Sequence, residues 1–213
     1  MNVGLILSGG TGTRLGGQIP KQYMVLDRKE VISYSLEAMQ KSHSVEAIVI
    51  VAAEKYSTDI KEKYGVDVAI AGDTRNESLF NGLRYIADKY PLCEKIFINE
   101  AARPFITADL VDEYLNLLDE YDAAITTAHI TDSLGKYGQH TTDRTEYYLI
   151  QAPEAFRFKL IFNNFKADSS LTATVQQLPP NSKIYKNFSF RNNIKITYPE
   201  DFAWAEDMMR SLN

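Results

Sequence analysis

Five short apolar runs, each followed by a polar or helix-like segment, constrain the fold of this 213-residue chain more than any other feature. These runs span residues 3–7, 47–52, 66–71, 95–99 and 123–128. Continuous apolar runs of this length are typical of strands that are buried on both faces of a sheet. The sequence therefore predicts a sheet with a covering layer on each side.

Helical patterns lie between and after these runs. Apolar residues spaced three and four apart predict a helix over 76–90 and another over 107–121, with Thr107 as the N-cap of the second. Near the C-terminus, Pro199 suits a first helical turn, and an apolar stripe follows it. The alternation predicts an α/β fold: a Rossmann-like, mostly parallel sheet with helices on both faces. Ligands of such sheets bind at the carboxyl ends of the strands.

One region departs from the alternation. Residues 131–150 are polar with turn-forming residues in the middle and β-rich residues at the end, which predicts a projecting β-hairpin arm or, alternatively, a surface loop. There is no internal repeat or low-complexity linker, so we expect residues 1–213 to form a single domain.

The charge and the cysteine content limit the possible partners. The net charge of −5 and the sequence pI of about 5.3 argue against a nucleic acid or an anionic membrane as partner. The single cysteine, Cys93, excludes an intrachain disulfide. Without a signal-peptide pattern or an apolar run long enough to cross a bilayer, the sequence favours a cytoplasmic protein.

A glycine-rich loop, LSGGTGTRLGGQIPKQY over residues 7–23, follows the first apolar run. Such a turn after a strand presents backbone N–H groups to an anion. The loop matches neither a Walker A motif, because Arg14 follows Thr13, nor a dinucleotide fingerprint, because Leu15 takes the place of the third glycine. Arg14 and Lys21 are cations that suit a triphosphate whose pyrophosphate leaves. A tight turn with solvated cations is the alternative.

Five ordered motifs make the loop more specific. G-G-T-G-T-R with P-K-Q-Y, then AGDTRNESLFNGL, EAARP, QAPEAF and NIKITYPED resemble the signature segments of cytidylyltransferases that activate small polyol phosphates. This family includes the methylerythritol-phosphate and ribitol-5-phosphate enzymes. The resemblance covers nearly the whole chain. It implies an enzyme, a CTP-dependent nucleotidyltransferase that transfers CMP to a polyol phosphate and releases pyrophosphate.

The resemblance also implies a nucleotide site. It implies that Arg14, Lys21 and Lys195 are catalytic and offset phosphate charge. The nucleotide-binding positions that it implies are Ser8, Gly9, Gly10, Thr11, Gly12, Gly72, Asp73, Ser78, Glu100 and Ala101. Gly72, Asp73 and Ser78 would read the cytosine, although Asp73 and Ser78 could instead cap the following helix. Lys195 falls in NIKIT, a strand-like run, where a solvent-facing lysine is the alternative reading.

An acceptor site, a metal and a partner subunit follow from the same resemblance. Arg103, Ser133 and Arg144 resemble positions that bind the acceptor phosphate, some of them supplied by the partner of a homodimer through the arm. The family reading also implies a divalent cation, Mg²⁺, beside the CTP phosphates, with Glu100 as its candidate protein ligand.

Three departures from the family concern specificity. Glu100 stands where the family usually has Asp, Ala152 and Glu154 replace the Thr and the second Gln of Q-T-P-Q, and LTAT at 171–174 replaces T-D-E/D-A. The glycine loop is closer to that of the ribitol-phosphate branch, and the arm is short. We therefore expect ribitol 5-phosphate or a related alditol phosphate for a surface polymer as acceptor, with methylerythritol phosphate of isoprenoid biosynthesis as the alternative. A catalytically inactive nucleotide-binding module is a further alternative.

Overall fold

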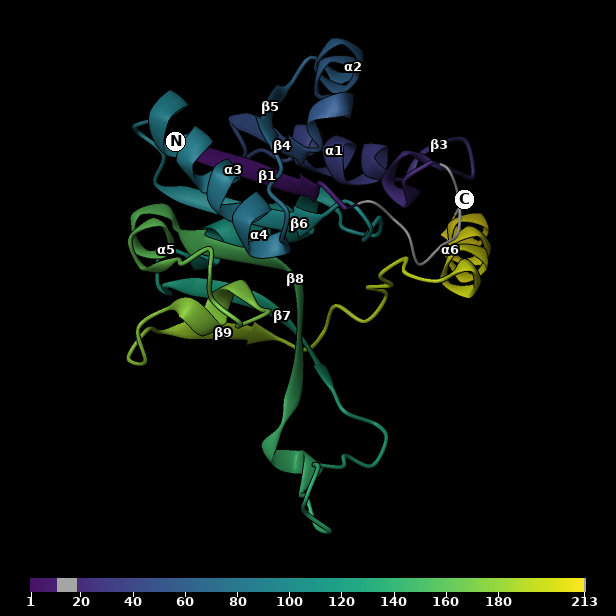
Figure 1. Ribbon diagram of the computed structural model, residues 1–213, viewed down its shortest axis with the longest axis vertical. Coiled ribbons are helices and arrows are strands. Elements are labelled where there is room, and N and C mark those ends of the chain that lie inside the picture. Colours follow the sequence, from purple (N-terminus) through teal and green to yellow (C-terminus); the bar gives the residue numbers. More distant parts are fainter. Residues whose placement is uncertain (11–18, 213) are drawn as a thin grey trace.

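A seven-stranded sheet forms the centre of the computed structural model, which describes residues 1–10 and 19–212 (Figure 1). In spatial order its strands are β5 (Asp67–Ile70), β4 (Ala47–Ala52), β1 (Asn2–Ser8), β6 (Lys95–Glu100), β8 (Tyr148–Arg157), β7 (Ala123–His129) and β9 (Ile184–Asn187). Strand β8 is antiparallel to both neighbours, and the other ladders are parallel. The predicted mostly parallel α/β sheet is confirmed.

Helices cover both faces of this sheet (Figure 1). They are α1 (Val31–Lys41), α2 (Glu54–Tyr64), α3 (Arg75–Lys89), α4 (Ala108–Leu117) and α5 (Phe158–Asn164), whereas α6 (Pro199–Leu212) lies beside the sheet. Leu83 of α3 and Ile161 of α5 belong to one core cluster with Leu5 of β1. Leu36 of α1 belongs to a second cluster with Ile6. Because Leu5 and Ile6 are neighbours that enter opposite cores, β1 is buried on both faces, as its unbroken apolar run predicts.

A third, smaller core fixes the end of the chain beside the sheet. Ala205 and Met209 of α6 pack with Leu26 of the short hairpin formed by β2 (Val25–Leu26) and β3 (Lys29–Glu30). Ile196, just before α6, lies in the same core, and its N–H donates to the carbonyl of Ala102 at 2.9 Å. This core therefore carries residues 193–198 to the end of β6.

The sequence predictions of secondary structure agree with the structure at most positions. All five apolar runs are strands, Thr107 caps α4 by accepting from Leu110 N–H, and Pro199 opens α6. Strand β9 and the part of β8 over 151–157 were not predicted. The run NIKIT was wrongly expected to be strand-like, because residues 193–197 join no ladder and bond instead to the turn after β6.

An arm projects from the sheet between β7 and β8 (Figure 1). Its base is an antiparallel ladder in which residues 126–129 pair with 148–151. Farther out lie a bridge between Lys136 and Gln139 and a short 3-10 helix, η3 (Arg144–Glu146). The predicted hairpin arm is confirmed. Within the residues that the structure describes, no helix is both long and apolar enough to cross a membrane.

Candidate active site

The predicted nucleotide-binding residues that the structure describes lie where the strand order reverses. Strand β1 lies between β4 and β6. After β1 the chain forms β4 and β5 on one side of it, and then β6 on its other side. Ser8 ends β1, Glu100 ends the neighbouring β6, and Gly72 follows β5 at the same edge of the sheet. The carboxyl edge at such a reversal is the usual ligand site of open α/β sheets.

The described start of the glycine loop is closely packed. A Cβ on Gly9 would lie 2.4 Å from Cβ of Ala71, whereas one on Gly10 would have no heavy atom of the described residues within 4 Å. Ser8 is buried, and its hydroxyl donates to the Tyr23 hydroxyl at 3.0 Å. Glycine at position 9 therefore lets the loop pass against the segment after β5. The predicted residues Thr11, Gly12 and Arg14 lie outside the described residues.

Gln22 holds the start of this loop by hydrogen bonds to two backbone carbonyls. It lies in the short 3-10 helix η2 (Lys21–Tyr23), and its buried Nε2 donates to the carbonyls of Ser8 at 2.8 Å and Gly10 at 2.7 Å. The neighbouring Lys21 extends its Nζ to the carbonyl of Ile196 at 2.5 Å. The P-K-Q-Y segment thus ties the glycine loop to the strand end and to the segment that carries Lys195.

The predicted cytosine-binding residues surround the start of α3. Ser78 is buried, and its hydroxyl accepts from Gly72 N–H at 3.1 Å and donates to the Gly72 carbonyl at 3.2 Å. The helix is capped by Thr74 in a capping box with Glu77. The alternative in which Asp73 and Ser78 cap α3 is therefore wrong. Asp73 is exposed and follows Gly72, whose backbone N–H and carbonyl both bond to the Ser78 hydroxyl.

Glu100 is the electrostatic centre of the site. Its Oε2 lies 2.6 Å from Nζ of Lys195 and 3.8 Å from Nε of Arg103, and its Oε1 accepts from Nε of Arg75 at 2.9 Å. Burial opposes ionisation of this carboxyl group, but the charges of Lys195, Arg75 and Arg103 lower its pKa to about 2. Glu100 is therefore a carboxylate at any working pH, enclosed by cations from three separate segments.

Lys195 and Arg103 differ in their access to a ligand. The Lys195 side chain is 39% exposed, so its ammonium group contacts both Glu100 and the open side of the site. Arg103 is buried, donates from Nη1 to the Asn193 carbonyl at 2.8 Å, and leaves its Nε without a hydrogen bond. Ala101 is also buried, and its N–H donates to the Leu7 carbonyl. The solvent-facing alternative for Lys195 is thus contradicted by its ion pair with Glu100.

A divalent cation would find one protein carboxylate here. Among the described residues, no group of three or more His, Cys, Asp or Glu side chains could hold a metal ion. The carboxylate of Glu100 lies at the site, and its Oε2 is paired with the Lys195 ammonium group at 2.6 Å. This donor set fits Mg²⁺, which is commonly bound by one or two carboxylates together with phosphates and waters.

Two predicted acceptor residues lie apart from this site. Ser133 and Arg144 are exposed on the arm, where Arg144 donates to the Thr131 carbonyl. Figure 1 shows the arm extending away from the sheet edge. The fold of one chain therefore does not bring these two residues to Glu100.

Two residues that hold the site together were missed by sequence reasoning. Gln22 and Arg75 stand inside the quoted motifs, but nothing in their spacing indicated a role. Arg75 opens α3, where a cation is usually solvated and unfavourable for the helix dipole. That unfavourable placement was the one signal that could have identified it.

Comparison with known proteins gives consistent matches over the whole chain. A family model described as 2-C-methyl-D-erythritol 4-phosphate cytidylyltransferase, IspD, matches residues 3–211. A protein of that name from Clostridium tetani is 30% identical over 232 residues, covering 100% of this chain and 92% of the relative. One from Clostridium botulinum is 28% identical, covering 98% and 97%. The crystal structure of 4-diphosphocytidyl-2C-methyl-D-erythritol synthase from Anaerococcus prevotii has a TM-score of 0.82 at 24% identity, covering 98% and 96%.

Proposed function

Because this chain belongs to the 2-C-methyl-D-erythritol 4-phosphate cytidylyltransferase family, we propose that it transfers CMP from CTP to 2-C-methyl-D-erythritol 4-phosphate. The predicted resemblance to polyol-phosphate cytidylyltransferases is confirmed, and the chain is a CTP-dependent nucleotidyltransferase. The observation that carries the acceptor is the family match over 3–211, together with relatives of the same name. It favours the methylerythritol alternative over the ribitol phosphate that we expected from the loop.

The charges at the end of β6 support this reaction. A phosphate oxygen of the acceptor attacks the α-phosphorus of CTP, and pyrophosphate leaves from the opposite side. The acceptor phosphate is largely ionised at neutral pH, so no protein nucleophile is needed. Lys195 stabilises the charge that builds on the α-phosphate, and Lys21 holds the departing pyrophosphate, with Arg14 assigned the same task. The hydrogen bond from Lys21 to the Ile196 carbonyl supports this pairing of roles.

Nucleotide recognition and metal binding are assigned to neighbouring residues. The backbone around Ser8, Gly9, Gly10, Thr11 and Gly12 receives the phosphates, whereas Gly72, Asp73 and Ser78 read the cytosine. Ala101 and Glu100 lie beside the sugar. When bound, Mg²⁺ neutralises charge on the phosphate oxygens, and Glu100 is the residue that would hold it. The support for this assignment is the place of Glu100 at the end of β6, beside the other candidate site residues.

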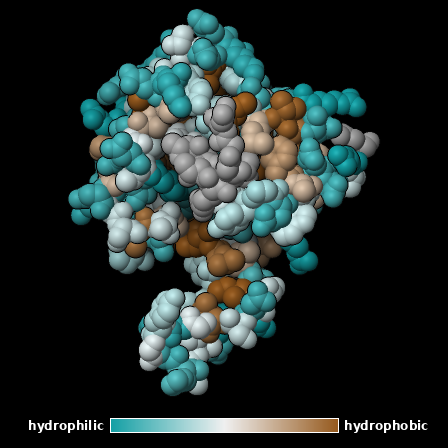
Figure 2. Space-filling model, turned by 45° about the vertical axis from the view of Figure 1, so that its right-hand side comes forward, coloured by the Kyte–Doolittle hydropathy of each residue, from teal (hydrophilic) through white to brown (hydrophobic). Residues whose placement is uncertain are grey.

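The arm supports a homodimer as the active form. Ser133 and Arg144 are assigned to the acceptor phosphate in the partner's site, because their own sheet edge is out of reach. Figure 2 shows apolar side chains gathered where the arm joins the body. Leu149, at the start of β8, is 50% exposed there. Buried Arg103 lies within its own subunit's site, where its Nε is 3.8 Å from Glu100 and its Nη1 donates to the Asn193 carbonyl.

Pyrophosphate release tests the acceptor. The protein is incubated with CTP and Mg²⁺ and, separately, with 2-C-methyl-D-erythritol 4-phosphate, ribitol 5-phosphate and sn-glycerol 3-phosphate. We expect kcat/KM for the first acceptor to exceed the others by about 100-fold, the discrimination that a few unpaired buried polar groups provide. A higher kcat/KM for ribitol 5-phosphate would instead support the ribitol-phosphate acceptor that the sequence led us to expect. CTP binding without turnover would favour the inactive module.

Replacement of Gln22 by methionine is expected to weaken CTP binding. Gln22→Met keeps the side-chain length but removes both donated bonds to the Ser8 and Gly10 carbonyls. Two hydrogen bonds of about 1 kcal/mol each predict an increase in the KM for CTP of about tenfold or more. Steady-state kinetics measure it, with the exposed residue changed in Gln40→Met as the matched control. An unchanged KM in folded Gln22→Met protein would show that the loop is positioned without this side chain.

A further inference from the structure

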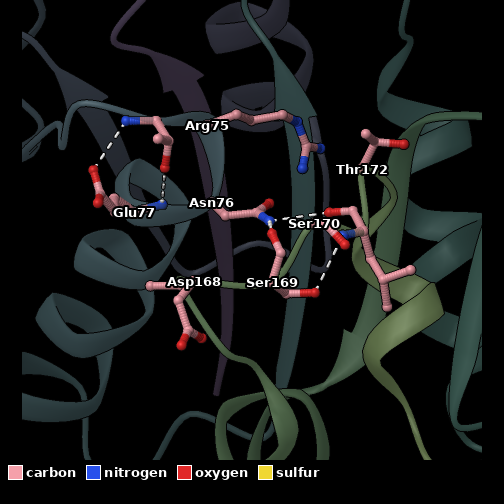
Figure 3. A pocket seen from close by; sticks show the side chains of 10 residues that line it. Arg75, Asn76, Glu77, Asp168, Ser169, Ser170 and Thr172 are labelled. Carbon is pink, nitrogen blue, oxygen red and sulfur yellow. Dashed lines mark hydrogen bonds between the residues drawn. The ribbon is translucent and has the colours of Figure 1, made fainter.

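The cations around Glu100 differ in what holds them in place. Arg75 opens α3, and the first turn of this helix is fixed because Asn76 donates to two backbone carbonyls on the other side of a pocket (Figure 3). Lys195 instead belongs to residues 193–197, which are described and form neither helix nor strand. The position of this lysine therefore depends on the individual contacts of its segment.

Asn193 anchors the N-terminal side of this segment to β8. Its side chain is buried, and its Nδ2 donates to the Ala152 carbonyl at 2.7 Å and to Oε1 of Gln151 at 3.0 Å. The Ala152 carbonyl can only accept a hydrogen bond, so a reversed amide would set Oδ1 of Asn193 against another oxygen. The orientation of the Asn193 amide is therefore fixed by its partners in β8.

These contacts lie where β8 separates from β6. The ladder between β6 and β8 ends with the pair of Ile98 and Glu154. The ladder between β7 and β8 is irregular between Glu154 and Gln151, so Ala152 belongs to no pair of either ladder. Asn193 therefore bonds to β8 at the point where this strand leaves β6 and continues into the arm.

The backbone of Asn193 provides a second anchor. Its carbonyl accepts from Nη1 of Arg103 at 2.8 Å, and Nε of the same guanidinium group lies 3.8 Å from Glu100. On the other side of Lys195, the N–H of Ile196 donates at 2.9 Å to a carbonyl of the turn after β6. Lys195 is thus held between two anchored residues, with its ammonium group 2.6 Å from Glu100.

We propose that Asn193 is a positioning residue for nucleotidyl transfer, because its amide holds the segment so that the ammonium group of Lys195 faces the α-phosphate of CTP. This inference rests on the proposed function. Without the two amide bonds, Ile196 still anchors one side of Lys195, but the other side is released and the ammonium group loses its fixed place. Gln22 holds the start of the glycine loop independently, so the loss concerns turnover and not CTP binding.

Removing the amide tests the proposal. A displaced charge keeps part of its effect, so Asn193→Leu, which keeps the branched shape, is expected to lower kcat about tenfold and to leave the KM for CTP within about twofold. Asn193→Ala, which leaves room for water at the Ala152 carbonyl, is made alongside it and is expected to show the same loss. Asn2→Leu is the matched control, since Asn2 donates to the Ser44 carbonyl at the start of β1, and it is expected to leave kcat unchanged.

A second set of variants shows whether Asn193 acts through Lys195. In a Lys195→Met background, Asn193→Leu is expected to lower kcat by less than about twofold, because the charge that it positions is already absent. A general loss of packing would instead lower kcat by the same factor in both backgrounds and would overturn the proposal. A folded Asn193→Leu protein with the kcat of the wild type would overturn it as well.

Thermal unfolding keeps this proposal separate from the proposed function. Tm is measured for the wild type, Asn193→Leu, Lys195→Met and the double variant. If Asn193 places Lys195 against Glu100, the double variant loses less than the two single losses added together, whereas additive losses would contradict the proposal. Absence of turnover by the wild type with every acceptor would reject the proposed function, and the Tm values would still decide whether Asn193 positions Lys195.

Discussion

Replacing Lys195 by methionine is expected to lower kcat about 100- to 1000-fold, the effect of removing one preorganised charge from a transition state. Its ammonium group lies 2.6 Å from Glu100, and Lys195 is the most exposed of the three cations around that carboxylate. The backbone around it is fixed independently, because Ile196 N–H donates to Ala102 and Asn193 donates to the Ala152 carbonyl. The loss therefore concerns charge at the reacting phosphate and leaves the fold intact.

The steady-state rate of CMP transfer, with CTP and acceptor both saturating, gives kcat. Lys159→Met is the matched control, since Lys159 is an exposed lysine on α5 and is expected to leave kcat unchanged. Circular dichroism establishes that both variants fold. A folded Lys195→Met protein with kcat within about threefold of the wild type would remove Lys195 from the mechanism, because a preorganised catalytic charge is worth far more.

The sheet was predictable because its strands are buried on both faces. Runs such as 47–52 contain little but Val, Ile and Ala, and a segment of that kind is stable in few places other than the middle of a sheet. Strand β8 was harder to predict, because its sequence YLIQAPEAFR contains a proline and two charged residues. Glu154 is tolerated there because the backbone N–H groups of Thr174 and Val175 donate to it, and those partners lie 20 and 21 residues further along the chain.

The strand prediction for the run around Lys195 was wrong for a related reason. Residues 193–197 alternate polar and apolar side chains, which predicts a strand. Their backbone and side-chain bonds go instead to Ala102, Ala152 and Asp201, so the segment crosses the edge of the sheet without joining it. Local periodicity reports which side of a segment is buried, but not what accepts its hydrogen bonds.

The residues of the candidate site could be predicted from the sequence, but the contacts among them could not. The motifs identified Glu100, Lys21 and Lys195 as site residues, and the structure places these three together. Their partners were not readable, because Arg75 lies 25 residues from Glu100 and Gln22 bonds to backbone carbonyls that any residue provides. Pairwise electrostatics depends on the folded distance, and sequence separation contains little information about it.

Replacing Glu100 by glutamine is expected to reduce the free energy of unfolding at pH 7 by about 3 kcal/mol, because the change leaves three cations without their shared counter-ion. The figure follows from a carboxyl pKa lowered from 4.5 to about 2, at 1.36 kcal/mol per pKa unit. A group with a depressed folded pKa contributes stability above its unfolded pKa, and this contribution is lost as the pH falls through the folded value. The difference between wild type and Glu100→Gln should therefore be largest above pH 4.5 and shrink toward pH 2.

Urea unfolding of both proteins at a series of pH values measures this difference. Asp67, Asp112, Asp119 and Asp143 also have lowered pKa values, but they are present in both proteins and cancel in the comparison. Asp119→Asn is the matched control, since Asp119 pairs with Lys95 at the surface and its loss should cost much less at pH 7. A constant difference between wild type and Glu100→Gln from pH 7 to pH 2 would mean that packing around Glu100, and not its charge, stabilises the fold. In that case solvent, and not this carboxylate, would have to balance the charges of Lys195, Arg75 and Arg103. The distances from their nitrogens to the Glu100 oxygens, 2.6, 2.9 and 3.8 Å, argue against this outcome.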